Sequence, residues 1–495
     1  MATTGFNNEL YIKKQSENIS KRIKEFGGKL YLEFGGKLFD DYHASRVLPG
    51  FVPDSKIQML RSMAEDVEMV IVISADDIEK SKARSDIGIS YTADVLRLID
   101  AFRDMGLFVG SVVISKYACQ PAANAFKNRM EQFGIRVYLH YPIDGYPNNV
   151  SYIVSDEGFG NNEYIETSRP LVVVTAPGPG SGKMATCLSQ LYHEYKRGLK
   201  AGYAKFETFP VWNLPLKHPV NLAYEAATAD LNDVNMIDPF HLEAYGVTSV
   251  NYNRDVEVFP VLNAIFESIE GKSPYKSPTD MGVNMVGFCI DDDDAVISAA
   301  KEEIVRRYFA ALCEKKKGTD NGNAVQKIEV IMRQAGITVN DRAVVPAAIR
   351  RSEETEGQPA VAIKLKDGRI VTGKTSELLG AASAALLNAV KAAAGIDESQ
   401  LLIRPEVIEP IQGLKVGHLG NKNPRLHTDE LLIALTISAT ANEVSRQAAD
   451  ALGLLRGSEA HSTVILSQVD EDIYRRLGIN LTCEPTYQTN RLFHK

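Results

Sequence analysis

The sequence contains few of the residues from which disulfide-linked or metal-knuckle proteins are built. Cysteine occurs five times among 495 residues, at scattered positions, and no Cys-x-x-Cys pair is present. This excludes a disulfide framework and a cysteine-based zinc knuckle, and we expect most cysteines to be small buried hydrophobic residues. No HExxH pattern occurs either, so we expect most of the nine histidines to be structural and predict no metal site.

Long apolar runs and an excess of basic charge are also missing. No stretch approaches the roughly 20 residues of a membrane-spanning helix, and the polar amino terminus lacks the apolar core of a secretory signal. Lysine and arginine number 55 against 63 acidic residues, giving a net charge of -8. These features predict a cytoplasmic protein that binds neither membranes nor nucleic acid.

Apolar residues are plentiful and are arranged in a regular order. The chain is 44% hydrophobic, and its length predicts two or three domains. Between residues 29 and 175, short apolar runs such as EMVIVISA and LVVVTA alternate with amphipathic helical patterns. This alternation predicts an α/β fold with a mostly parallel sheet and helices on both faces. Ligands of such sheets bind outside the carboxyl ends of the strands.

Changes in composition divide the chain into three predicted parts. We expect an N-terminal α/β domain over residues 1–275, a helical middle segment over 276–325 and a C-terminal α/β domain over 326–495. In the last part, AVAIKLKDGRIVTG reads as a hairpin that turns at Asp367-Gly368. The helices and strands that follow predict three layers.

The segment LVVVTAPGPGSGK, residues 171–183, is the most informative stretch of the chain. A buried strand leads into a glycine-rich turn, and an amphipathic helix with apolar residues such as Cys187, Leu188 and Leu191 begins directly after the lysine. This arrangement points unpaired backbone amides at an anion in the turn. The sequence therefore predicts a binding site for a nucleotide or another phosphorylated small molecule, formed by Gly178, Gly180, Ser181, Gly182 and Lys183.

The turn departs from a complete phosphate-binding P-loop at two of its four fixed positions. Pro177 stands where the first glycine belongs, and Met184 replaces the hydroxyl residue that holds magnesium. Ser181 and Thr186 are the nearby hydroxyl residues that could replace it. Two hypotheses therefore stay open: an enzyme of phosphoryl or nucleotidyl transfer that uses a nucleotide with magnesium, and a non-catalytic protein that binds an anion or serves assembly as a homo-oligomer.

Three residues outside the turn are candidate catalytic groups. Asp76 follows the run VIVIS, where an acid can hold magnesium at the end of a strand, although aspartate there also caps helices. Asp238 and His241 belong to a long irregular stretch, residues 205–245, which we expect to form one wall of the ligand site.

Long segments of the chain resemble a known family. They are KLYLEFGGKLFDDYHASRVLPGF, APGPGSGKMATCLSQLYHEYKRG, FPVWNLPLKHPVNLAYEAATADLNDVNMIDPFHLEAYG and SPTDMGVNM. They look like the bacterial domain of unknown function 1846 family, also called uncharacterised protein family 0371, over essentially the whole chain. The resemblance implies a C-terminal domain similar in topology to cytidine deaminases but without zinc ligands, and it implies no activity. Some relatives carry an ATP-dependent peptidase label, yet this chain has neither a nucleophile elbow nor a zinc signature.

Overall fold

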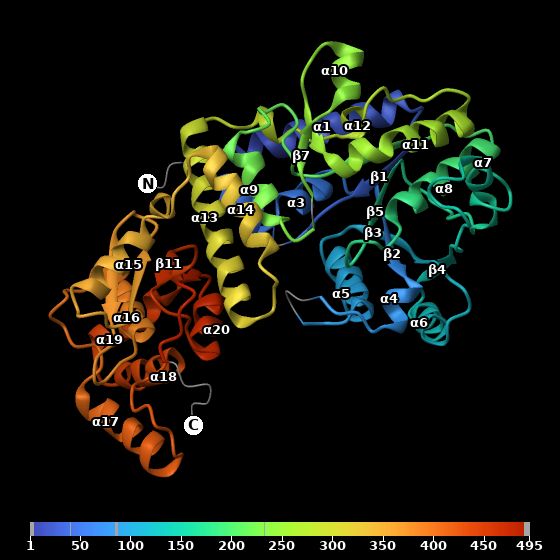
Figure 1. Ribbon diagram of the computed structural model, residues 1–495. Coiled ribbons are helices and arrows are strands. Elements are labelled where there is room, and N and C mark those ends of the chain that lie inside the picture. The colour runs from blue at the N-terminus through green and yellow to red at the C-terminus, as the bar shows by residue number, and fades with distance from the viewer. Residues whose placement is uncertain (1–3, 40, 85–87, 232, 490–495) are drawn as a thin grey trace. The chain divides into compact units, whose positions relative to one another are not determined.

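The chain folds into two units. The computed structural model describes residues 4–39, 41–84, 88–231 and 233–489. Within them, the N-terminal unit comprises residues 4–225 and 233–297, and the C-terminal unit comprises 226–231 and 298–489 (Figure 1). Their boundary falls inside the predicted middle segment, because helix α13 (Asp293–Lys317) begins in one unit and continues in the other.

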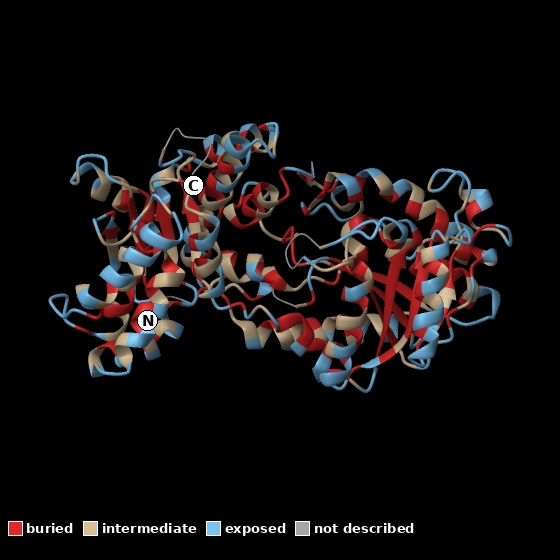
Figure 2. Cartoon of the chain, turned by 90° about the horizontal axis from the view of Figure 1, so that it is seen from below, coloured by how far each residue is buried: buried red, intermediate tan, exposed pale blue. Residues whose placement is uncertain are grey.

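A six-stranded parallel sheet forms the centre of the N-terminal unit. Its order is β4-β3-β2-β5-β1-β6, and every neighbouring pair is parallel. The strands are buried on both faces (Figure 2), which explains their nearly continuous apolar runs. They are β1 (Leu30–Phe34), β2 (Val67–Ser74), β3 (Phe108–Ser115), β4 (Arg136–Leu139), β5 (Leu171–Thr175) and β6 (Gly202–Phe206). The predicted parallel α/β architecture is thus confirmed.

The strand order shows that the direction in which the chain adds strands to the sheet reverses at β5. The chain steps outward through β2, β3 and β4, and then returns to insert β5 between β2 and β1. At such a reversal the connections leave the sheet in opposite directions and open a crevice at the carboxyl ends. The glycine turn follows β5 directly, so it lies at this edge.

One face of the sheet is covered by α8 (Lys183–Lys196) and α11 (Asn253–Glu270). Tyr31 and Val172 of the sheet share one core with Leu188 of α8 and Phe259 of α11. The helix predicted after Lys183 is confirmed. The other helices of this unit are α1 (Asn8–Glu25), α2 (Tyr42–Val47), α3 (Ser55–Ser62), α4 (Ala75–Glu79), α5 (Tyr91–Asp104), α6 (Pro121–Gln132), α7 (Val150–Ile153), α9 (Pro219–Ala227), α10 (Pro239–Tyr245) and α12 (Pro278–Met281), with a small antiparallel pair β7 (Asn235–Ile237) and β8 (Val250–Tyr252).

The C-terminal unit contains a mixed sheet of order β10-β9-β11-β12. Its strands are β9 (Ala360–Lys364), β10 (Ile370–Lys374), β11 (Glu459–Ser462) and β12 (Asn480–Cys483). The predicted hairpin is confirmed as β9 and β10, and Gly368 takes the positive φ of +88° that its turn requires. The helices are α14 (Asn323–Ala335), α15 (Val344–Glu353), α16 (Ala381–Ala394), α17 (Pro405–Gly413), α18 (Thr428–Ala439), α19 (Glu443–Asp450) and α20 (Gln468–Arg476). Across the described residues of both units, no helix has the length and apolar character to span a membrane.

Candidate functional site

The glycine turn uses its glycines for two different purposes. Gly180 and Gly182 have φ angles of +74° and +94°, a left-handed conformation that side chains disfavour. Gly178 instead makes room, because a methyl group at this position would collide with the phenol of Tyr91. The turn therefore needs glycine at each of the three positions.

Helix α8 begins with its backbone donors unsatisfied. Its N-cap is Gly182, which offers no side-chain acceptor, and the first capping bond runs from the Thr186 amide to the Gly182 carbonyl at 2.9 Å. Within the described chain, the four amides of residues 182–185 donate to no acceptor. These are the groups that a helix start leaves free for an anion.

The side chains around this helix start are also incompletely paired. Among the described residues, the ammonium of half-buried Lys183 has neither a hydrogen-bond nor an ion-pair partner. The hydroxyls of Ser181 and Thr186 are buried and likewise make no hydrogen bond within the described chain. A hydrogen bond fixes the backbone of the turn, because the Ser115 hydroxyl at the end of β3 donates to the Ser181 carbonyl at 2.5 Å.

Asp76 follows β2, the strand next to β5, and is exposed on α4. The Ser74 hydroxyl accepts a hydrogen bond from the backbone amide of Asp76 at 3.3 Å. Asp76 and Asp77 therefore lie in the first turn of a capped helix. Its neighbour Asp77 binds Lys82 at 3.2 Å, and that ammonium lies 5.1 Å from the ring centre of Tyr91. Since Tyr91 packs on Gly178, this chain of contacts connects the loop after β2 to the glycine turn.

Asp238 and His241 lie together at the start of α10, where both make hydrogen bonds within the protein. Asp238 is fully buried and caps that helix, and its second oxygen accepts the Thr279 hydroxyl at 2.6 Å and the Thr279 amide at 3.2 Å. The His241 ring nitrogen Nδ1 lies 3.0 Å from the Ser277 hydroxyl. Both oxygens of Asp238 are therefore engaged within the protein, and the catalytic role of Asp238 and His241 stays a prediction.

A second group of polar residues, which the sequence interpretation did not include, lies at the carboxyl ends of β1 and β6. Glu33 and Lys205 are direct neighbours in the register of these strands, so their side chains share a face. The Lys205 ammonium lies 2.5 Å from the carboxylate of Asp255, in the first turn of α11, and 3.2 Å from Glu207. The Tyr203 hydroxyl donates to Glu33 at 2.6 Å. We call Glu33, Lys205, Glu207 and Asp255 the edge cluster.

Burial and mutual repulsion shift the acidity of the edge cluster. Burial, together with the negative charges of Asp255 and Glu33, raises the pKa of Glu207 to about 7, although the Lys205 ammonium lowers it. Burial lowers the pKa of Lys205, but Asp255 and Glu207 outweigh this effect and hold the pKa above its usual value. Lysine thus keeps its charge, while Glu207 titrates near neutral pH.

Electrostatics connect the edge cluster to the glycine turn. Burial raises the pKa of the Cys187 thiol in α8, the carboxylate of Glu33 raises it further and the Lys183 ammonium lowers it. The pKa of the Cys187 thiol is therefore affected by both the lysine of the turn and a carboxylate of the edge cluster. The two groups of residues belong to one region at the carboxyl edge of the sheet.

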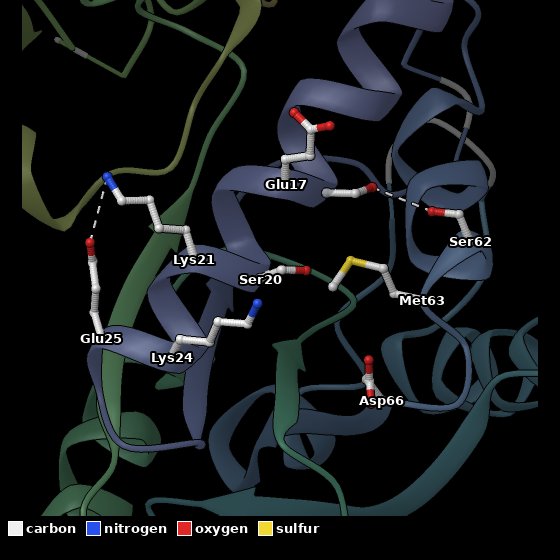
Figure 3. A pocket seen from close by; sticks show the side chains of 9 residues that line it. Glu17, Ser20, Lys21, Lys24, Glu25, Ser62, Met63 and Asp66 are labelled. Carbon is white, nitrogen blue, oxygen red and sulfur yellow. Dashed lines mark hydrogen bonds and ion pairs between the residues drawn. The ribbon is translucent and has the colours of Figure 1, made fainter.

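The hollows of the N-terminal unit differ in size and position. The largest one described has a volume of about 650 Å³ and lies between α1 and α3, beside Glu25 and Asp66 (Figure 3). These residues precede β1 and β2, so this hollow is at the amino edge of the sheet, away from the glycine turn. A cavity of about 50 Å³ lies at the carboxyl edge and is lined by Lys205, Glu207, Trp212, Asp255 and Thr279, among others. The chemistry of the site therefore coincides with the smaller cavity.

This cavity takes part of its lining from the segment 205–245, as Trp212 shows. Within the described chain, no group of three or more histidine, cysteine, aspartate or glutamate residues is arranged to hold a metal ion. The edge cluster illustrates why, since the Lys205 ammonium occupies the space among its carboxylates. The contacts that the structure shows within the edge cluster are ionic.

Comparison with known sequences identifies the family. Residues 4–336 match the family described as Domain of unknown function DUF1846, N-terminal, and residues 340–493 match its C-terminal counterpart. The chain belongs to the DUF1846 family. It is 59% identical to a UPF0371 protein of Streptococcus pneumoniae strain JJA and to one of strain CGSP14, over the full length of both chains in each case. The predicted resemblance is confirmed, and the DUF1846 match includes both the glycine turn and the edge cluster.

Proposed function

We propose that this DUF1846 protein binds a nucleotide or another phosphorylated small molecule at the glycine turn, Gly178 to Lys183. The observation that carries the proposal is the start of α8, where four backbone amides and the Lys183 ammonium lack partners in the described chain. Phosphate oxygens would accept from the amides, and the lysine would neutralise their charge.

Two further features support this proposal. The turn follows β5, the strand at which the winding of the sheet reverses, and this is where ligands of open α/β sheets bind. The unpaired hydroxyls of Ser181 and Thr186 add donors beside the amides. The five unpaired cysteines suit a reducing compartment, and we propose that binding takes place in the cytoplasm.

The test is ligand-induced stabilisation of the full-length protein. We expect at least one of ATP, GTP, ADP and inorganic phosphate, with or without Mg²⁺, to raise the thermal unfolding midpoint, because a ligand that binds only the folded state stabilises it. Lys183→Ala should abolish most of this rise, since it removes the only side-chain cation proposed for the phosphate.

Lys196→Ala is the matched control. Lys196 lies at the other end of the same helix, is largely exposed and pairs with Asp156 at 3.2 Å. We expect this variant to keep the full ligand-induced rise. Absence of a rise with every ligand, or an unchanged rise in Lys183→Ala, would remove the proposal.

A further inference from the structure

The glycine turn extends across the carboxyl edge of the sheet as far as β3. It leaves β5, and β2 lies between β5 and β3 in the sheet. The Ser115 hydroxyl at the end of β3 donates to the Ser181 carbonyl at 2.5 Å, and a Cβ added at Gly182 would lie 3.2 Å from the Ser115 hydroxyl oxygen. Because Gly182 is the N-cap of α8, the loop that follows β3 begins beside the start of this helix.

Lys116, the first residue of this loop, has a backbone conformation that is unfavourable for lysine. Its φ angle is +52°, in the left-handed region that glycine adopts freely and other residues rarely adopt. Hydrogen bonds hold the loop in place: the Tyr117 amide donates to the His140 carbonyl at 2.9 Å, and the Gln120 side chain donates to the Lys116 carbonyl at 3.1 Å. Backbone strain of this kind is concentrated at ligand sites. Glycine would suit the position better, so the lysine side chain itself needs an explanation.

The ammonium of Lys116 is available to a ligand. Lys116 is exposed, and among the residues that the structure describes its ammonium makes neither a hydrogen bond nor an ion pair, like that of Lys183. Asp76 follows the neighbouring strand β2, and its carboxylate has no ion-pair partner in the described chain either, whereas Asp77 is paired with Lys82. Two unpaired ammonium groups and one unpaired carboxylate thus leave a net positive charge near the free amides of α8, which suits an anion.

The start of α8 already provides the donors that one phosphate group needs. A phosphate monoester has three acceptor oxygens and about two negative charges. The four free amides of residues 182–185 and the Lys183 ammonium match them. The Ser181 hydroxyl, in a side chain that is 2% exposed, is a further donor without a partner in the described chain. Lys116 comes from a different strand connection and therefore adds a second point of positive charge.

We propose that Lys116 binds the second phosphate group of a ligand that carries at least two linked phosphates. This inference rests on the proposed function, and it narrows the ligand from phosphorylated molecules in general to pyrophosphate or a nucleoside di- or triphosphate. Lys183 and the amides of α8 hold the first phosphate group, and Lys116 neutralises the group linked to it. Because the loop is already held by hydrogen bonds, only the lysine side chain loses freedom on binding.

The test compares ligands with one and with two phosphate groups on the full-length protein. Orthophosphate, AMP, inorganic pyrophosphate and ADP are titrated by isothermal titration calorimetry, each with and without Mg²⁺. We expect pyrophosphate or ADP to bind at least about tenfold more tightly than orthophosphate or AMP, because the second phosphate group gains a charged hydrogen bond. Preference for pyrophosphate over orthophosphate identifies free diphosphate as a ligand, and preference for ADP over AMP identifies a nucleotide.

Lys116→Gly removes the ammonium and suits the backbone. We expect its thermal unfolding midpoint without ligand to lie within about 2 °C of the wild-type value or above it, because relief of the left-handed conformation offsets the extra freedom of glycine in the unfolded chain. The Kd for pyrophosphate or ADP should rise by about tenfold or more, while the Kd for orthophosphate or AMP should stay within about twofold. Lys116→Arg retains the positive charge and should retain most of the preference.

Glu356→Gly is the matched control for the backbone change. Glu356 is an exposed residue of the C-terminal unit with a φ angle of +56°, so the same substitution relieves the same conformation there. We expect this variant to bind all four ligands with the affinity of the wild type.

The two proposals fail in distinguishable ways. If the wild type binds orthophosphate as tightly as pyrophosphate and AMP as tightly as ADP, the second phosphate site is overturned and phosphate binding at the turn stands. If Lys116→Gly retains the preference, or weakens both classes of ligand equally, the second phosphate site is overturned in the same way. If none of these ligands, nor ATP or GTP, binds the wild type, both proposals fail. The preference of the wild type is measured without any variant, so misfolding of a variant cannot decide the result.

Discussion

The two units each contain a buried cation on a sheet, but the two cations have different surroundings. In the C-terminal unit, Arg342 is 1% exposed and binds Glu459 at 2.5 Å, the Thr482 hydroxyl at 3.2 Å, and the carbonyls of Ala460 and Asn480 at 3.0 and 2.8 Å. In the N-terminal unit, the Lys205 ammonium contacts the carboxylates of Asp255 and Glu207. Glu33 lies beside it on the neighbouring strand β1, and Lys205 also lines a cavity.

The difference separates a structural cluster from one that titrates. The guanidinium of Arg342 donates to acceptors on both β11 and β12, so the arginine joins two strands of the sheet. In the edge cluster, burial and the neighbouring carboxylates raise the pKa of Glu207 to about 7, so the ionised form of this side chain works against stability. Shifted pKa values of this kind are concentrated at functional sites.

Removal of Arg342 should cause the largest loss of stability. Arg342→Met removes the ion pair with Glu459, which keeps the Asn480 side-chain amide as a donor at 2.6 Å, and removes a donor from two carbonyls, and we expect a loss of about 3–5 kcal/mol in the free energy of unfolding. Urea unfolding followed by circular dichroism measures it. Arg350→Met, at an exposed position of α15, is the control and should change stability by less than about 0.5 kcal/mol. A loss below about 1 kcal/mol for Arg342→Met would contradict the structural role.

Glu207→Gln should act in the opposite direction at alkaline pH. The pKa of Glu207 rises from 4.5 to about 7 on folding, so between these values the folded protein holds a proton that the unfolded chain has lost. Stability attributable to this group therefore falls as pH rises from about 4.5 through about 7. Since a quarter of the side chain is exposed, we expect the neutral glutamine to stabilise the protein at pH 8 by about 1–3 kcal/mol.

The measurement is the difference in unfolding free energy between Glu207→Gln and the wild type at pH 5 and at pH 8. The difference should be small at pH 5, where Glu207 of the folded wild type is protonated and thus neutral like glutamine, and positive at pH 8. Glu257→Gln, at an exposed position of α11, is the control and should change stability by less than about 0.5 kcal/mol. A glutamine variant that is less stable at pH 8 would make the edge cluster structural, like that of Arg342.

Local patterns in the sequence predict much of this fold because each depends on neighbouring residues. The apolar run of β5, the glycines of the turn and the apolar face of α8 are continuous in the chain, and all three are confirmed. The hairpin at Gly368 is confirmed for the same reason. Whether the turn binds phosphate is a different question, since partners for its amides depend on a ligand.

The edge cluster could not be assembled from local pattern, because its members come from distant segments. Glu33 and Lys205 become neighbours only through the pairing of β1 with β6, and Asp255 arrives on α11. One signal was available: Lys205 interrupts an otherwise apolar strand, GYAKF, and a charged residue there must find a partner. Asp238 was a candidate because of its acidic side chain. In the structure, its carboxylate oxygens accept hydrogen bonds from the His241 amide at the start of α10 and from Thr279.

His427 offers the smallest and most localised test of the comparison. Its Nδ1 lies 3.0 Å from Asp470, which also accepts from the Ser467 hydroxyl at 2.7 Å and the Thr428 amide at 2.9 Å, so this cluster joins the starts of α18 and α20. The hydrogen bond to Asp470 raises the pKa of His427, although burial opposes it. Burial raises the pKa of Asp470, but His427 and the other donors outweigh it and lower the pKa overall.

These shifts fix the pH window in which the pair stabilises the protein. The contribution of His427 is complete below its unfolded pKa of about 6.5 and is lost as pH rises through its higher folded value. The contribution of Asp470 is present above about pH 4 and is lost as pH falls through its lower folded value. His427→Gln should therefore cost about 1 kcal/mol near pH 5.5 and less at pH 8.5, by urea unfolding at both values. An equal cost at the two pH values would mean that the His427 ring is held by packing and not by its charge, and this cluster would then differ in kind from the one around Glu207, whose pKa lies near 7.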